Sequence, residues 1–218
     1  MNIATPLTPP PGWSSLLAVA GDPSALVAEL LPRYAEPHRR YHGVAHLDVL
    51  ADLFEQVAAG PGWRRPVEVA LAMLFHDAIY TPGRSDNEAR SAGLAREHLC
   101  ECELERGDVG WIDVERVAAW IEATAAHGEV AAEDPDLAHF LDADVAILGA
   151  PARVYDGYAE GVFEEFAPVV GAAAYRVGRR AFLHAQLARP NLFHTPWFAA
   201  RYEAQARANL ARELAASV

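Results

Sequence analysis

The chain has 218 residues, of which 52% are hydrophobic, and a formal net charge of −12. This length and apolar fraction suffice for one domain with a sizeable buried core. The negative charge argues against a general nucleic-acid surface, because polyanions bind through clustered Lys and Arg. Small phosphorylated substrates remain compatible with it, since a buried metal ion reverses the local field. No apolar run approaches the about 18 residues that a membrane span needs, so we expect no membrane association.

The N-terminus and the cysteines favour a cytoplasmic protein. Residues 1–12 are rich in Pro and Thr and lack the positive and apolar regions of a secretory signal. The two cysteines, Cys100 and Cys102, lie too close together for an ordinary disulfide framework and suit a reducing compartment. As a lone C-x-C pair they are weak evidence for zinc.

Helical periodicity and capping signals occur throughout the chain, whereas strand-like alternation is absent, so the sequence predicts an all-α fold. We expect residues 1–21 to be a poorly ordered tail. Residues 22–218 are expected to form a single domain, with a metal-site core at about 38–150 and additional helices at 151–218. Helices are expected from Asp22-Pro23 to the stop formed by Pro32 and Pro37, at about 44–58, 66–80, 86–102 and 112–127, from Asp134-Pro135 onward, and three times in the C-terminal third, the last from Thr195-Pro196.

One stretch, residues 71–80, is an apolar run that only the adjacent His76 and Asp77 interrupt. A carboxylate is costly to bury unless something pairs with it. The simplest partners for Asp77 are His76 or a bound cation. The alternative is a packing helix whose last polar turn reaches solvent.

Three further positions add candidate ligands. His42 and His46 are four residues apart and share a helix face, and His46 is on the apolar side of its helix. Asp144 lies on the apolar stripe of its own predicted helix, whereas Asp142 is about 200° away and is expected either to bond to residues behind the ligands or to lie at the surface. Two imidazoles and two carboxylates suit a divalent transition metal such as Mn, Fe, Co, Ni or Zn.

These residues, in this order, resemble the HD-domain superfamily of metal-dependent phosphohydrolases, and more closely a bacterial subgroup of predicted HD phosphohydrolases. The resemblance covers most of the chain from about Arg33 onward. The matching segments are Glu36-Pro37-His38-Arg39-Arg40-Tyr41-His42, Phe75-His76-Asp77-Ala78-Ile79-Tyr80, Ser85-Asp86-Asn87-Glu88 with Ser91, and Phe140-Leu141-Asp142-Ala143-Asp144.

The resemblance implies an HD-type helical bundle with additional C-terminal helices, and metal ligands at His46, His76, Asp77 and Asp144. It also implies hydrolysis of a small phosphate ester, either a nucleotide or another phosphomonoester or phosphodiester. His42 competes with His46 as the first ligand. The resemblance names no substrate.

Four neighbouring residues are candidates for catalytic roles. Glu88, beside Asn87, is placed to act as general acid/base or to hold the metal-bound water, although Ser85 and Glu88 equally form a capping box. His127 is a candidate phosphate contact or second-metal ligand, and it also suits the dipole at a helix C-terminus. Arg40 either clamps phosphate or is a solvated loop charge.

Two other classes of function stay open. Some HD-type sites hold two irons and oxidise their substrates, which requires extra ligands such as His42 and His127. A binding module that keeps its metal only for stability would carry the same ligands. The oligomeric state is not evident from the sequence.

Overall fold

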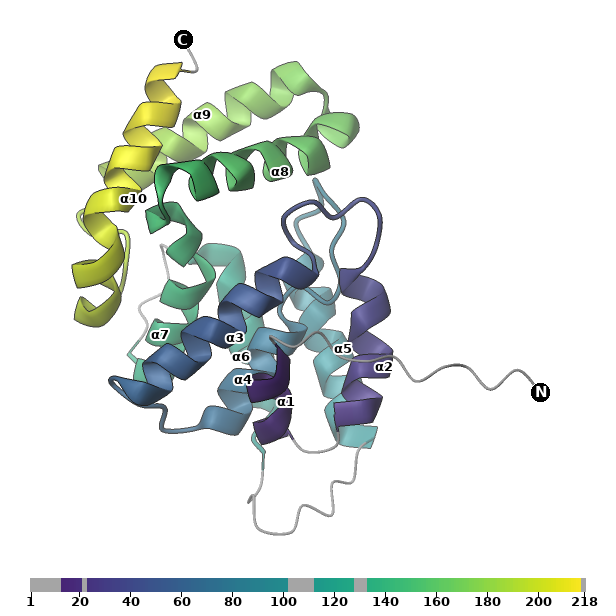
Figure 1. The fold of residues 1–218 in the computed structure, drawn as a ribbon. Helices are drawn as coiled ribbons and strands as arrows, with labels where there is room; N and C mark the ends of the chain where they lie inside the picture. Colours follow the sequence, from purple (N-terminus) through teal and green to yellow (C-terminus); the bar gives the residue numbers. More distant parts are fainter. Residues whose placement is uncertain (1–12, 21–22, 102–111, 128–132, 217–218) are drawn as a thin grey trace. The chain divides into compact units, whose positions relative to one another are not determined.

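The computed structural model describes residues 13–20, 23–101, 112–127 and 133–216. Within these residues the secondary structure is α-helical, with short 3-10 turns and no β-strand, so the all-α prediction is confirmed (Figure 1). None of the described helices is both long and apolar enough to cross a bilayer. The helices are α1 (Ser14–Ala20), α2 (Pro23–Tyr34), α3 (Val44–Ala59), α4 (Pro66–Phe75), α5 (Asn87–Glu101), α6 (Val114–Ala123), α7 (Pro135–Asp144), α8 (Ala152–Val170), α9 (Ala172–Ala188) and α10 (Pro196–Ala216), with 3-10 turns η2 (Thr124–Ala126) and η3 (Ala146–Gly149).

The contacts within the chain group it into two compact units. The first consists of Met1–Pro37, His42–Tyr80 and Asp86–Ala125, and the second of His38–Tyr41, Thr81–Ser85 and Ala126–Val218. The short loops before α3 and α5 therefore group with the C-terminal helices. The single domain expected over 22–218 stays a prediction.

Helix α4 is the centre of the first unit. Every residue from Glu68 to Phe75 is buried, and α1, α3, α5 and α6 all pack against this helix. A helix that is apolar on every side has to be enclosed by other elements. The apolar run in the sequence therefore identifies the core helix of this unit.

The expected N-terminal tail is wrong over residues 13–20. Trp13 and Leu16 have no exposed surface and Leu17 is 3% exposed, and α1 packs against α3 and α4. Burial of these apolar side chains stabilises a helix that the Pro/Thr-rich start of the chain did not suggest. Residues 1–12 and the predicted N-cap Asp22 lie outside the described residues.

Most other helix boundaries agree with the prediction. The helices expected at 44–58 and 86–102 correspond to α3 and α5, and that at 112–127 to α6 followed by η2. Their expected ends at Cys102 and Gly128 lie outside the described residues. Helix α2 ends at Tyr34, between the two prolines expected to stop it, and Pro32 lies inside its last turn. The buried Tyr34 side chain fixes that turn by a hydrogen bond to Leu74 C=O.

The second unit contains the three predicted C-terminal helices. Helix α9 packs against both α8 and α10 (Figure 1). Helix α10 also packs on η3. Their contacts bury Tyr155, Leu183 and Phe198 completely. Gly149 allows the close approach of α10, because a Cβ at this position would lie 2.6 Å from Tyr202 Cβ.

A polar cluster joins the three C-terminal helices. Arg179 donates two hydrogen bonds of 2.9 Å to the Glu213 carboxylate, and Tyr155 donates a third. Burial alone would raise the pKa of Glu213, but the bonds from Arg179 and Tyr155 hold that pKa below its usual value. Burial and the bond to Glu213 raise the pKa of Tyr155. The Glu213 carboxylate is therefore ionised and paired at neutral pH.

Candidate metal centre

The residues at the end of α4 shape the site. The last four carbonyl groups of a helix have no partner within it, yet all four in α4 accept a hydrogen bond. The donors are His76 N–H to Ala72 at 2.9 Å, His76 Nδ1 to Met73 at 2.8 Å, the Tyr34 hydroxyl to Leu74 at 3.0 Å and Ala78 N–H to Phe75 at 3.0 Å. These caps stop the helix at Phe75, so its expected continuation to Tyr80 is wrong.

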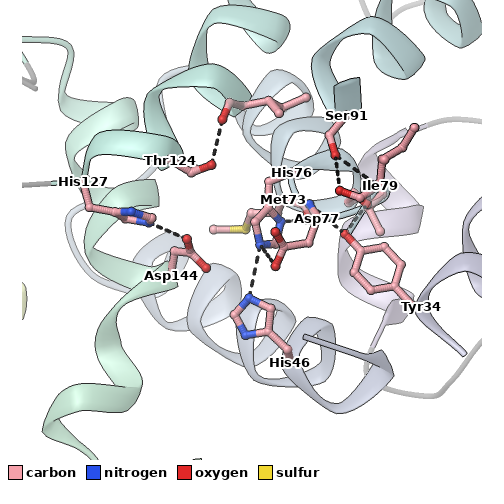
Figure 2. A network of polar contacts seen from close by, with 12 residues as sticks. Tyr34, His46, Met73, His76, Asp77, Ile79, Ser91, Thr124, His127 and Asp144 are labelled. Atoms are coloured by element: carbon pink, nitrogen blue, oxygen red, sulfur yellow. Dashed lines mark hydrogen bonds and ion pairs between the residues drawn. The ribbon is translucent and has the colours of Figure 1, made fainter. Parts of the chain in front are cut away.

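The cap also sets the tautomer of His76. A carbonyl oxygen only accepts, so Nδ1 of His76 carries the proton that bonds to Met73. In the neutral ring the lone pair is then on Nε2, the form in which imidazole binds metals. This Nε2 lies 3.2 Å from Nε2 of His46 and 3.2 Å from Oδ2 of Asp77 (Figure 2).

Two buried side chains fix the turn that follows α4. The Tyr34 oxygen accepts a hydrogen bond of 3.2 Å from the Asp77 N–H. The Ser91 hydroxyl accepts from Ile79 N–H at 3.0 Å and donates to Ile79 C=O at 3.2 Å (Figure 2). Sequence reasoning missed Tyr34, because no local pattern points to a partner 43 residues away. Ser91 belonged to the matched motif, but its role was not predicted.

His46, His76 and Asp144 form a group that could hold a metal ion: one ligand atom from each lies within 4.8 Å of the others. His46 is 4% and His76 1% exposed, and the Asp144 side chain is 11% exposed. Two ligand atoms about 2.1 Å from one ion, at tetrahedral or octahedral angles, lie about 3.0–3.4 Å apart. The 3.2 Å between the two Nε2 atoms fits that spacing.

The remaining ligand candidates lie beside this group. Asp77 is not part of it and contacts it through His76. His42 is also not part of it: its ring stacks on Tyr80, with centroids 4.5 Å apart, and its centroid lies 6.2 Å from that of His46. The geometry therefore favours His46 over His42 as the first ligand.

The two aspartates of α7 have different partners. Asp142 has no exposed surface, so the expectation of a surface position is wrong. Its carboxylate accepts hydrogen bonds from His194 N–H at 2.6 Å and from the N–H and hydroxyl of Thr195 at 2.8 and 2.7 Å. Burial raises the pKa of Asp142, although these donors act in the opposite direction. Asp142 thus fixes the start of α10, a contact that its position in the sequence did not reveal.

His127 contacts the other aspartate. Its Nε2 lies 2.5 Å from Oδ2 of Asp144 (Figure 2). Because a carboxylate only accepts, Nε2 of His127 carries the proton in this contact. That nitrogen is then not available as a metal ligand while the bond persists.

The other catalytic candidates lie at element ends. Asn87 is buried and Glu88 half-buried in the first turn of α5. Asp86 holds the N-cap position, because its carbonyl accepts the first helical bond from Arg90 N–H. The residue at position N3 is then Ala89, so the capping box expected from Ser85 and Glu88 does not form. Whether Asn87 and Glu88 take part in catalysis stays a prediction.

Arg40 belongs to a loop that is fixed to α8. Glu165, 2% exposed, accepts hydrogen bonds of 2.7 Å from the backbone N–H groups of Arg40 and Tyr41. The Arg40 side chain is 57% exposed and lies 3.6 Å from Glu164. Its role in binding phosphate stays a prediction.

Comparisons of the chain with protein-family models, with curated proteins and with solved structures return no match.

Proposed function

We propose that the chain is a metal-dependent phosphohydrolase with an HD-type fold, acting on a small phosphate ester. The observation that carries the proposal is the group of His46, His76 and Asp144. The bond from Nδ1 of His76 to Met73 C=O leaves the lone pair on Nε2, where a metal can bind. The donor set fits a divalent transition ion. Asp77, whose Oδ2 is 3.2 Å from that Nε2, is the fourth proposed ligand.

The protein groups supply binding, orientation and proton transfer. Once bound, such an ion lowers the pKa of a water molecule and polarises a phosphoryl oxygen. Glu88 exchanges protons with the attacking water in this proposal, with Asn87 beside it. Arg40 binds the phosphate, for which the substrate has to displace Glu164 from the guanidinium, 3.6 Å away.

The test is phosphate release from a panel of nucleotides and aryl phosphates in the presence of Mn, Co or Ni. We expect release that stops on chelation and is lost in His76→Ala. His184→Ala, an exposed histidine on α9, is the matched control and should retain full activity. Equal release by wild type and His76→Ala would identify a contaminating phosphatase and contradict the proposal.

Elemental analysis separates hydrolysis from the two other classes of function. Hydrolysis predicts about one metal ion per chain. Two irons per chain with oxygen consumption and no phosphate release would indicate an oxidase. A metal-loaded protein that is inert on the whole panel would indicate a binding module.

A further inference from the structure

A chain of hydrogen bonds in the second unit leads from Asp142 to Asp144. Asp142 accepts from the backbone of His194 and from Thr195. His194 Nε2 donates to the backbone carbonyl of His127 at 2.7 Å, and His127 Nε2 donates to the carboxylate of Asp144. Because Asp142 and Asp144 lie in the same last turn of α7, the bonds close a ring around that turn.

We propose that His194 and Asp142 are positioning residues that hold Asp144 in place as a metal ligand. The inference rests on the proposed metal site, and neither residue is a member of the group of possible ligands. Their effect passes through His127, whose backbone is fixed by His194 and whose ring is bonded to Asp144. Ligating carboxylates are commonly fixed by such outer hydrogen bonds, and loss of one typically lowers metal affinity by about 10–100-fold.

The bond directions fit this role. The acceptors in the ring are two carboxylates and one carbonyl, so every donor proton has a defined position. The His194 ring must carry its proton on Nε2, and so must His127. Asp142 also binds Thr195, whose hydroxyl in turn accepts from Phe198 N–H at 3.3 Å and caps α10. The start of α10 is therefore a rigid support for His194.

The first experiment measures Co(II) affinity and the visible Co(II) spectrum of His194→Phe and His194→Gln. Phe keeps a ring but removes the donor, so we expect affinity to fall about 10-fold or more with a changed spectrum. Gln retains an amide donor near the place of Nε2 and should restore most of both. His184→Phe, on the exposed face of α9, is the control and should bind as wild type does.

The second experiment combines His194→Phe with Asp142→Asn. If both residues act through the same ring of hydrogen bonds, their effects on Co(II) affinity are not additive, because the first substitution has already interrupted that ring. Additive losses of Co(II) affinity would show that the two residues do not act through one ring and would contradict the proposal. Far-UV circular dichroism establishes that each variant is folded. If His194→Phe is not, Asp142→Asn alone serves, since the loss of one ionised acceptor should also lower Co(II) affinity.

A readout without metal separates this inference from the proposed function. In the metal-free wild type, imidazole 15N shifts should show His127 protonated at Nε2, and His194→Phe should mix the two tautomers. A wild type that binds no Co(II) would refute the metal site, and with it any ligand role for Asp144. Wild-type metal binding with unchanged affinity and tautomer in His194→Phe would refute the positioning role alone.

Discussion

Removal of the Tyr34 hydroxyl tests whether the cap of α4 supports the site. Tyr34 is 1% exposed, and its oxygen donates to Leu74 C=O and accepts from Asp77 N–H. Tyr34→Phe keeps the ring, so no cavity forms, but it leaves two buried backbone groups, Leu74 C=O and Asp77 N–H, with one hydrogen bond fewer. Each such group costs about 1–3 kcal/mol. We therefore expect the free energy of unfolding to fall by about 2–4 kcal/mol. This is less than the sum for two groups, because Phe has no hydroxyl whose burial would itself cost free energy.

The assay is urea unfolding of the metal-free protein, followed by circular dichroism. Tyr202→Phe on α10 is the matched control, because the Tyr202 hydroxyl makes no hydrogen bond within the described part of the chain; it should change stability by less than about 0.5 kcal/mol. Hydrogen exchange at the Asp77 amide should also be faster in Tyr34→Phe. A Tyr34→Phe protein as stable as Tyr202→Phe, with unchanged exchange, would refute the reasoning.

Three other substitutions test separate parts of the structure. His46→Gln should abolish metal binding in elemental analysis while His42→Gln retains it; the reverse would make His42 the first ligand. Ser91→Ala should destabilise the protein by about 1–3 kcal/mol in thermal unfolding, because Ile79 loses a donor and an acceptor, and an unchanged melting temperature would contradict this. The pKa of Glu213 is lowered in the folded state. The ionised Glu213 therefore stabilises the fold above the ordinary carboxyl pKa of about 4.3, and this stabilisation is lost as the pH falls through the folded-state pKa. Glu213→Gln should therefore melt below wild type at pH 7, and the difference should shrink as the pH falls below about 4.3, whereas a constant difference would count against the pairing with Arg179.

The helices were largely predictable because their signals are local. Spacing of apolar residues places α3 and the three C-terminal helices, and Asp134-Pro135 marks the start of α7, where Asp134 accepts from Asp136 N–H as an N-cap. The same patterns suggested His46, His76 and Asp144 as inward residues, and the structure brings these three together. Periodicity succeeds wherever a side chain's direction is set by its own helix.

The errors occur where a distant partner overrides the local signal. Trp13 and Leu16 lie in a segment with weak helical signals and are ordered by burial against other helices. Helical phase separates Asp142 from Asp144, but phase cannot reveal that His194 and Thr195, more than 50 residues away, enclose Asp142. A polar residue directed away from one site can thus be buried in another contact.

The His76-Asp77 pair shows why the fold and the chemistry of the site cannot be separated. A continuous helix would direct these adjacent side chains about 100° apart, and it would satisfy the α4 carbonyls with backbone donors. In the structure the helix ends, and the His76 ring becomes one of the capping donors through Nδ1. The bond that ends the helix therefore also leaves the lone pair of Nε2 directed toward His46. A substitution that let α4 continue would then remove the ligand geometry even with every proposed ligand still present.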